Sequence, residues 1–403
     1  MTSALTNSVP ARTRLVPDQL IFPVCSRLRS WIEARDFAGH EPFDLLNSPF
    51  LQRRWLREPP LSYCWIQFGK RLGGQRVRQW LQVPPSRNPK ALGLLLAGYC
   101  DLQREGEDCA SQFAALKRYL VALRSPNEQD YCWGYDWDYV SLRGAKLPAF
   151  AMNAVATCFC AEALLDLAEI TGDGEALRMG LSAARALTNR LNRSADTSDA
   201  LCFSYTPQDR LLIFNSSALV AGLLSRAASR GGDPQYLELA QRAMRYLTSM
   251  QRPDGSWFYG TDRRHHWIDS FHTGYNLCAL LEYRNYSGDA SVDEAIEKGY
   301  AFYRLAFFLE DGTPKYFASS VYPIDIHACA HAIVTFCAFR ARDAGALAMA
   351  RKIANWTMAS MLSPDGSFYF QRHRLWINRT PYMRWGQAWM FHALTRLLRE
   401  VPA

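Results

Sequence analysis

Residues 253–296 carry the pattern that decides the fold: PDGSWFYG (253–260) opens the stretch and YSGDASVDEAI (286–296) closes it, with a helix-length run between them. The first motif joins Asp-Gly to aromatic residues, which is typical of a turn that leads into a short extended segment. The second motif places Gly-Asp before a charged amphipathic run, which predicts a tight turn and a helix capped by the aspartate. The stretch therefore predicts a unit of long loop, helix, tight turn and second helix.

This unit recurs along the chain. The tight turns centre on Asp108, Asp173, Asp233, Asp289 and Asp343, at spacings of 65, 60, 56 and 54 residues. The aromatic loops lie half a period away and are CWGYDWDY (132–139), CFSYTPQD (202–209), PDGSWFYG (253–260), EDGTPKYF (310–317) and PDGSFYFQ (364–371). Self-similarity at a fixed period predicts a repeated two-helix unit.

The two helices of each unit differ in composition. Helices after the long loops are expected to begin near Pro148, Asn215, Asp269, Asp325 and Pro381. They are apolar and rich in small residues, as in 149–170, so we expect them to be buried on most sides. Helices after the tight turns carry one charged face, as in 236–250, and should be amphipathic. This division predicts an inner and an outer layer.

Five hairpins span residues 88–362, and the last helix, 382–399, has no partner after it. A helix near 24–35 could supply that partner and close a sixth pair. The alternative is an open solenoid, but such repeats are usually shorter and have short loops on both edges. Long loops on one edge favour a closed all-α ring with one functional mouth.

We divide the chain into an N-terminal segment, 1–87, and a ring domain, 88–403, which together form one fold unit. The segment contributes the closing helix, and its remainder, 36–87, is expected to form loops and short helices over one rim. The oligomeric state stays open.

The composition is that of a folded globular protein, with 49% apolar and 21% charged residues. A formal charge of +8 favours anionic ligands, but no Lys/Arg run is dense enough to predict a nucleic-acid partner. The eleven cysteines contain no CxxC pair and are expected to be buried thiols. No long apolar run or N-terminal leader occurs, so we expect no membrane span and a cytoplasmic location.

The layout resembles the (α/α)6 toroid superfamily, which includes glycoside hydrolases, polysaccharide lyases and sugar epimerases. The run Arg384-Trp385-Gly386-Gln387-Ala388-Trp389 is similar to the Arg-Gly-Gln-Ala-Trp run of unsaturated-glucuronyl hydrolases, with Trp385 as an extra residue. The overall layout also looks like the C-terminal helical domain of glucuronyl C5-epimerases. The resemblance implies an (α/α)6 toroid and activity on uronate-containing saccharides.

The strongest candidate site is Arg263-Arg264-His265-His266-Trp267-Ile268-Asp269-Ser270-Phe271-His272. With a helix starting at Asp269, His272 lies one turn on and on the same face. Asp269 is then placed to orient an imidazole, and His266 or His272 to exchange protons near neutral pH, with Arg264 as an anion ligand. The competing interpretation is a capping aspartate beside a solvated basic loop.

A second candidate site lies one period later, at Tyr322, Asp325 and His327. Asp325 occupies the place in its repeat that Asp269 has 56 residues earlier. His331 shares a helix face with His327, but without a HExxH motif or a third ligand we predict no metal and no cofactor. His331 is expected to be a core histidine.

The loop at 133–139 combines aromatic rings for sugar stacking with carboxylates, and Trp133, Asp136, Asp138 and the nearby Arg143 are predicted to bind substrate. Packing of the loop into the core is an equally weighted alternative. Further candidates on the same rim are Tyr205, Lys315, Arg374, Tyr382, Arg384 and Trp385. Arg suits a carboxylate because it binds in a bidentate manner.

Three functions are weighed. The first is an epimerase or lyase of polysaccharide biosynthesis or modification, which abstracts the C5 proton of a uronate with a histidine base, an arginine and a tyrosine acid. The second is a glycoside hydrolase on imported acidic oligosaccharides. The third is a non-enzymatic ring that binds a glycan or a protein. No serine elbow, Walker loop or Rossmann fingerprint occurs.

Overall fold

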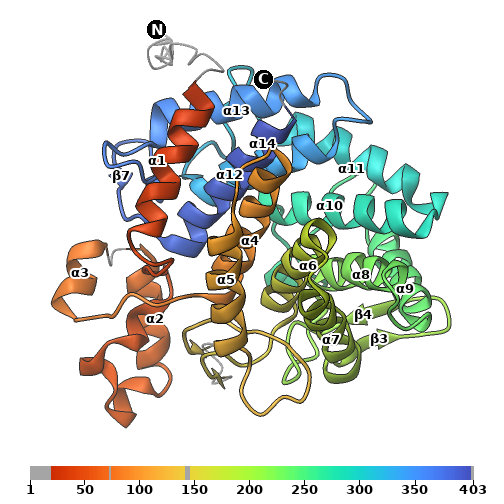
Figure 1. Cartoon of the computed structure of the whole chain (residues 1–403), viewed down its shortest axis with the longest axis horizontal. Helices are drawn as coiled ribbons and strands as arrows, with labels where there is room; N and C mark the ends of the chain where they lie inside the picture. The colour runs from red at the N-terminus through yellow and green to blue at the C-terminus, as the bar shows by residue number, and fades with distance from the viewer. Residues whose placement is uncertain (1–19, 72–73, 141–145, 401–403) are drawn as a thin grey trace, which may run out of the picture.

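The computed structural model describes residues 20–71, 74–140 and 146–400, which form a ring of helical hairpins (Figure 1). The inner helices are α4 (Pro89–Arg104), α6 (Ala154–Thr171), α8 (Phe214–Ser229), α10 (Ser270–Ser287), α12 (Ile326–Ala338) and α14 (Trp389–Arg399). The outer helices are α1 (Ile21–Glu33), α5 (Ala110–Ala122), α7 (Gly174–Arg190), α9 (Gln235–Ser249), α11 (Asp293–Ala306) and α13 (Ala346–Met361).

The inner helices close on themselves. Each packs against the next in chain order, and α14 packs back against α4. Outer helix α1 packs against inner helix α14, although the two lie at opposite ends of the chain. The first and last helices of the ring thus form the sixth pair. The predicted all-α ring of helical hairpins is thus confirmed.

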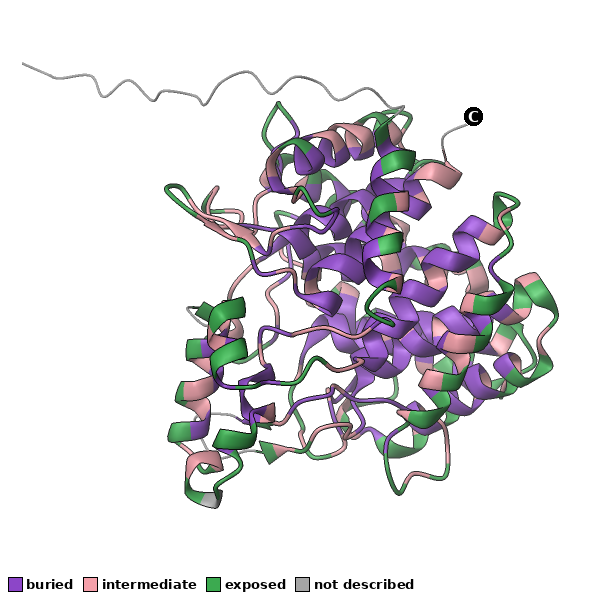
Figure 2. Ribbon diagram, turned by 60° about the vertical axis from the view of Figure 1, so that its left-hand side comes forward, coloured by how far each residue is buried: buried purple, intermediate pink, exposed green. Residues whose placement is uncertain are grey.

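Burial follows the two layers, with the purple inner helices at the centre of Figure 2. Helix α12 buries almost every residue, whereas α9 buries one stripe and exposes the rest. The distinction follows from composition, because α12 is made almost entirely of apolar and small residues and α9 has a charged face.

Asx residues fix where most inner helices begin. Asn88, Asn153, Asp269 and Asp325 cap α4, α6, α10 and α12, each accepting backbone N–H groups of the first turn. Helix α6 therefore begins at Ala154, later than the expected start near Pro148, because the cap is Asn153.

At the other end of α6 and α10, Gly172 and Gly288 adopt the left-handed conformation (φ 72° in both), which terminates the helix at low steric cost. The next residue in each case, Asp173 or Asp289, accepts backbone N–H groups at the start of the outer element. The predicted tight turns therefore have their expected chemistry.

Short strands occur in the long loops, as predicted. The antiparallel pairs are β1 (Tyr139–Val140) with β2 (Lys146–Leu147), β3 (Arg193–Asp196) with β4 (Leu201–Phe203), and β6 (Gln371–Arg372) with both β5 (Ile324–Asp325) and β7 (Ile377–Asn378). Strand β5 ends at the cap of α12, so this small sheet fixes the position of Asp325.

The N-terminal segment supplies short helices besides α1. They are η2 (Asp44–Asn47), η3 (Pro49–Leu51), η4 (Arg54–Arg57), α2 (Leu61–Arg71) and α3 (Gln75–Trp80). Helix α2 packs on η2, η4 and β1, beside the long loops. The division at residue 87 stays a prediction. Within the described residues, no helix is long and apolar enough to cross a membrane.

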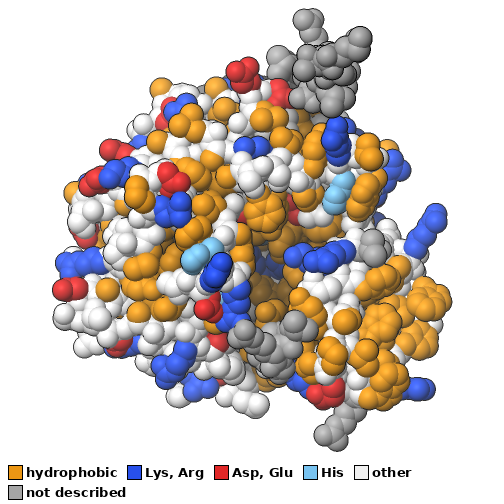
Figure 3. Space-filling model, turned by 180° about the vertical axis from the view of Figure 1, so that it is seen from behind, with side chains coloured by type: hydrophobic (Ala, Val, Ile, Leu, Met, Phe, Trp, Pro, Cys, Tyr) orange, Lys and Arg blue, Asp and Glu red, His pale blue; other side chains and the backbone are white. Residues whose placement is uncertain are grey.

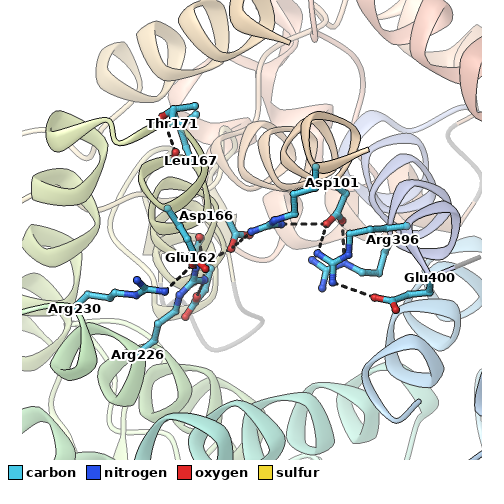
Figure 4. Close-up of polar contacts among 12 residues, drawn as sticks. Asp101, Glu162, Asp166, Leu167, Thr171, Arg226, Arg230, Arg396 and Glu400 are labelled. Atoms are coloured by element: carbon cyan, nitrogen blue, oxygen red, sulfur yellow. Dashed lines mark hydrogen bonds and ion pairs between the residues drawn. The ribbon is translucent and has the colours of Figure 1, made fainter. Parts of the chain in front are cut away.

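The end of the ring that carries the tight turns encloses a cavity of about 590 Å³. Arginines and carboxylates cross-link the helices around it (Figure 4). Arg226 of α8 binds Glu162 and Asp166 of α6, and Arg396 of α14 binds Asp101 of α4. These ion pairs join inner helices that are neighbours in the ring and stabilise its closure.

Candidate functional site

The long loops and the first turns of the inner helices form the mouth of the ring. Figure 3 looks onto this end and shows a central hollow with Lys and Arg side chains inside and beside it. Helix N-termini point to this end, and their dipoles favour negative charge.

Asp269 and Asp325 have matching roles at this end. Each is fully buried, caps an inner helix and accepts an indole N–H: Trp267 Nε1 lies 3.0 Å from Asp269 Oδ2, and Trp385 Nε1 lies 2.9 Å from Asp325 Oδ1. Asp325 also accepts from Gln371 Nε2 at 2.7 Å. Burial raises the pKa of Asp325 to about 6, against the opposing effect of these hydrogen bonds.

Asp269 holds the ring of His272. Nδ1 of His272 lies 2.7 Å from Oδ2 of Asp269, and the backbone N–H of His272 donates to Oδ1 at 2.9 Å. The imidazole is half-buried and packs on Tyr259 and Phe271. A carboxylate on Nδ1 leaves Nε2 available, which is the arrangement of an oriented general base.

A chain of three buried polar groups lies deeper in the mouth. Lys90 Nζ donates to Tyr275 OH at 3.0 Å, and that hydroxyl lies 2.9 Å from Nε2 of His327. Burial lowers the pKa of Lys90 and of His327 well below their usual values and raises the pKa of Tyr275. Desolvation therefore disfavours the charged form of all three groups.

Aromatic rings hold His327 in place. Its imidazole stacks on Phe271 and Trp389, with ring centroids 4.4 and 4.8 Å away, and Trp385 meets it edge-on. Nδ1 of His327 is buried without a hydrogen-bond partner. A buried polar atom left unpaired at a helix N-terminus is a feature of sites that bind or exchange protons with a ligand.

Arg384 and Glu41 form the charged part of the site. Nε of Arg384 donates to Oε2 of Glu41 at 3.0 Å, and its backbone N–H donates to Oε1 at 2.9 Å. The guanidinium also faces the rings of Tyr135, Trp137 and Trp385. Burial, with Asp136 nearby, raises the pKa of Glu41 to about 8 against the effect of Arg384. Near neutral pH the positive charge of Arg384 is then only partly compensated.

Tyr135 and Trp137 stack in parallel, with centroids 4.6 Å apart, and the hydroxyls of Tyr135 and Tyr205 lie 3.0 Å apart. Burial raises the pKa of Tyr135 and of Tyr205, so both phenols are neutral donors. Asp136 is buried and accepts from Ser86 and Asn88. These groups line the mouth beside Arg384.

The structure thus brings several predicted residues together: Asp269, His272, Asp325, His327, Asp136, Tyr205, Arg384 and Trp385. It does not bring the remaining ones into this group. His266 is exposed, and its ring stacks on Phe258 and contacts Thr261 O through Nε2. Arg264 is exposed and pairs with Asp262, and Arg374 is exposed near the β6–β7 turn.

Others are committed to packing. Trp133 is fully buried and donates its indole N–H to Leu120 O at 2.8 Å, so it is a core residue. Tyr382 is buried beneath Arg78, and Lys315 donates to Ala318 O. Asp138 pairs with Arg57, and Tyr322 is half-buried before a cis proline. Arg143 lies outside the described residues.

Sequence reasoning missed Lys90, Tyr275 and Glu41. The signal for Lys90 was present, because it is a lone lysine in the first turn of an otherwise apolar inner helix. Tyr275 was one tyrosine among many, and nothing local marks Glu41. No group of three or more His, Cys, Asp or Glu within the described ranges could hold a metal ion.

Comparison with known proteins gives the fold. No family model and no curated relative matches the chain. A cellobiose 2-epimerase from Bacillus thermoamylovorans aligns with a TM-score of 0.63 and 14% identity over 79% of this chain and 90% of that chain. An unsaturated glucuronyl hydrolase specific for heparin aligns with a TM-score of 0.56 and 15% identity over 79% of this chain and 89% of that chain.

A possible member of the GH105 family from Salmonella enterica serovar Paratyphi A aligns with a TM-score of 0.64 and 12% identity over 99% of this chain and 100% of that chain. At these identities the likeness establishes the fold alone. The predicted resemblance to (α/α)6 toroids is confirmed, since these similar structures are carbohydrate-active enzymes of that architecture.

Proposed function

We propose that the chain is an enzyme that removes the C5 proton of a uronate in an acidic saccharide, as an epimerase or a lyase. The observation that carries the proposal is the buried hydrogen-bonded chain Lys90–Tyr275–His327 beside the cationic Arg384. Proton transfer next to a carboxylate needs a base, an acid and a cation, and the mouth contains all three.

Each group has a distinct role in this proposal. His272, held by Asp269, takes the C5 proton. The electron pair moves into the carboxylate as an enolate, which Arg384 stabilises. Tyr275 is the acid, because its phenol is neutral and Lys90 donates a hydrogen bond that stabilises the phenolate left behind. Return of a proton to the opposite face of C5 gives an epimer; expulsion of the C4 substituent gives an unsaturated product.

Names of the similar structures support a saccharide substrate, as they include an epimerase and a glucuronyl hydrolase. The basic side chains in the hollow of Figure 3 support an acidic one. A cytoplasmic role in polysaccharide modification stays part of the proposal.

A hydrolase is the second candidate, and Asp325 favours it. A buried carboxyl with a pKa of about 6 can be a general acid, and Asp269 occupies the equivalent position on the neighbouring inner helix. Hydrolysis would require protonation of the glycosidic oxygen by Asp325 and attack by water.

The test is incubation with uronate-containing oligosaccharides in deuterated water, followed by proton NMR, ultraviolet absorbance and a reducing-end assay. Deuterium at C5 without cleavage identifies an epimerase, and new absorbance identifies a lyase. New reducing ends without absorbance identify a hydrolase and overturn the first proposal. His272→Ala should abolish C5 exchange, whereas His266→Ala should retain it, because the His266 ring packs on Phe258.

A further inference from the structure

The N-terminal lobe, defined as residues 49–71 and 74–82, exposes an unusual amount of apolar surface. It makes up less than a tenth of the chain, yet five of the fifteen large hydrophobic side chains exposed in the described residues belong to it. These are Phe50, Trp55, Leu61, Phe68 and Trp80, and the two tryptophans are 59% and 76% exposed. Exposed clusters of this kind mark interaction sites.

Helix α2 has its apolar stripe turned toward solvent. Its buried positions are Ser62, Ile66 and Gly69, and a Cβ on Gly69 would overlap Leu45. Ile66 packs with Leu46 of η2 beside the small residues Ser62 and Gly69, and the exposed stripe of α2 is Leu61, Cys64 and Phe68. A surface helix ordinarily presents polar residues outward, so this stripe is built for an apolar environment.

The same lobe is strongly basic. It holds seven Lys and Arg and one acidic residue, so it carries six of the chain's eight net positive charges. Arg53, Arg71 and Arg76 are exposed and form no ion pair with any described residue. Figure 3 shows the lobe at its right-hand side, with hydrophobic side chains gathered there and Lys and Arg around them.

We propose that the outer face of the N-terminal lobe docks onto an anionic phospholipid surface. Exposed Trp, Phe and Leu insert at the boundary between headgroups and acyl chains, and surrounding arginines bind acidic headgroups. A second copy of the chain fits poorly, because the exposed Arg53, Arg71 and Arg76 of two such faces repel each other. An acidic saccharide polymer is the competing occupant, and the test below distinguishes it from a phospholipid surface. This inference does not depend on the proposed function.

The test is co-sedimentation with vesicles of phosphatidylcholine alone and of phosphatidylcholine with phosphatidylglycerol. We expect sedimentation with the anionic vesicles only, and release in high salt. Changing Trp55→Ser with Phe68→Ser should abolish binding, and changing Arg71→Gln with Arg76→Gln should weaken it roughly 30-fold. All four side chains are exposed, so the fold should persist, as checked by circular dichroism.

Matched controls lie on the outer helices. Leu237→Ser with Leu305→Ser, and Arg118→Gln with Arg178→Gln, change exposed residues of the same kinds elsewhere on the ring and should leave vesicle binding intact. Cys64 is the one exposed cysteine of the eleven, so a polarity-sensitive maleimide dye reports on this stripe. Its emission should shift to the blue on anionic vesicles.

Absence of sedimentation with anionic vesicles at low salt would overturn the proposal. So would an equal loss of vesicle binding in the lobe variants and in the control variants. Self-association that depends on Trp55 and Phe68 without vesicle binding would assign the face to a second copy instead. Binding of a soluble acidic polysaccharide without vesicle binding would assign it to the substrate.

Discussion

The hydroxyl of Tyr275 lies 2.9 Å from Nε2 of His327 and 3.0 Å from the amine of Lys90. The three residues come from inner helices α10, α12 and α4, so the contact spans the lumen of the ring. Because desolvation disfavours the charged form of each group, the three residues form a buried hydrogen-bonded path along which a proton can move.

Replacing Tyr275 with Phe should interrupt this path. We expect C5 proton exchange to fall roughly 100-fold or more, the usual scale for loss of a general acid. Stability should fall by only about 1 kcal/mol per lost hydrogen bond. Tyr283→Phe is the control, because Tyr283 is a buried tyrosine on the far part of α10 whose hydroxyl binds Asp289 at 2.7 Å. Equal losses of exchange in both variants would contradict a role for Tyr275.

Arg384→Met should discriminate between charged and neutral substrates. Loss of a charge-assisted contact should weaken the productive binding of a uronate substrate roughly 10- to 100-fold. The methyl ester of the same oligosaccharide should be affected much less. The measurement is kcat/KM of the native protein and of Arg384→Met for the acid and for the ester. An equal fall in kcat/KM for the two substrates would show that Arg384 does not recognise the carboxylate.

Lys90→Met should change how stability depends on pH. Burial lowers the pKa of Lys90 in the folded protein, whereas the unfolded chain binds a proton there below its usual pKa of 10.5. Unfolding of the native protein is therefore favoured by low pH, and its free energy should rise with pH. As the pH rises toward 10.5, we expect the free energy of unfolding of the native protein to increase relative to that of Lys90→Met. Urea unfolding of both proteins across this pH range measures this difference.

Asp325 should make the free energy of unfolding fall as the pH rises, which is opposite to the effect of Lys90. Its folded pKa of about 6 exceeds the usual 3.8, so its contribution to stability is complete below pH 3.8 and is lost as the pH rises through about 6. Asp325→Asn removes this loss, so its stability relative to the native protein should increase between pH 4 and 7, by on the order of 3 kcal/mol.

Asp289 provides the contrast to Asp325. Its pKa is lowered to about 2, with hydrogen bonds from Tyr283 and Ser291 outweighing partial burial. Asp289→Asn should therefore lose stability relative to the native protein above pH 3.8, and this difference should shrink as the pH falls through about 2. Thermal unfolding across the pH range measures the stability of both variants relative to the native protein. If this relative stability changed with pH in the same direction for Asp325→Asn and Asp289→Asn, the assigned pKa shifts would be contradicted.

The sequence alone determined the ring and its repeating unit. The Gly-Asp turns and the caps at Asp269 and Asp325 are encoded within a few residues, because a side chain accepts the N–H groups of the turn that follows it. Helix faces are encoded locally too, since burial follows composition at helical spacing. The pairing of Asp269 with His272 falls in the same class, because three positions on a helix place the two side chains together.

Only the tertiary structure decided which other residues meet. Glu41 and Arg384 are 343 positions apart and become partners because the ring closes at its two ends. Lys90, Tyr275 and His327 converge for the same reason, through the packing of three separate hairpins. The orientation of loop side chains was also decided by the tertiary structure. His266 and Trp133 belong to the predicted motifs, but the ring of His266 packs on Phe258 and that of Trp133 lies in the core. Contacts across a closed ring cannot be predicted from local sequence, because the two residues in contact belong to different helices and each is surrounded in sequence by the pattern of its own helix.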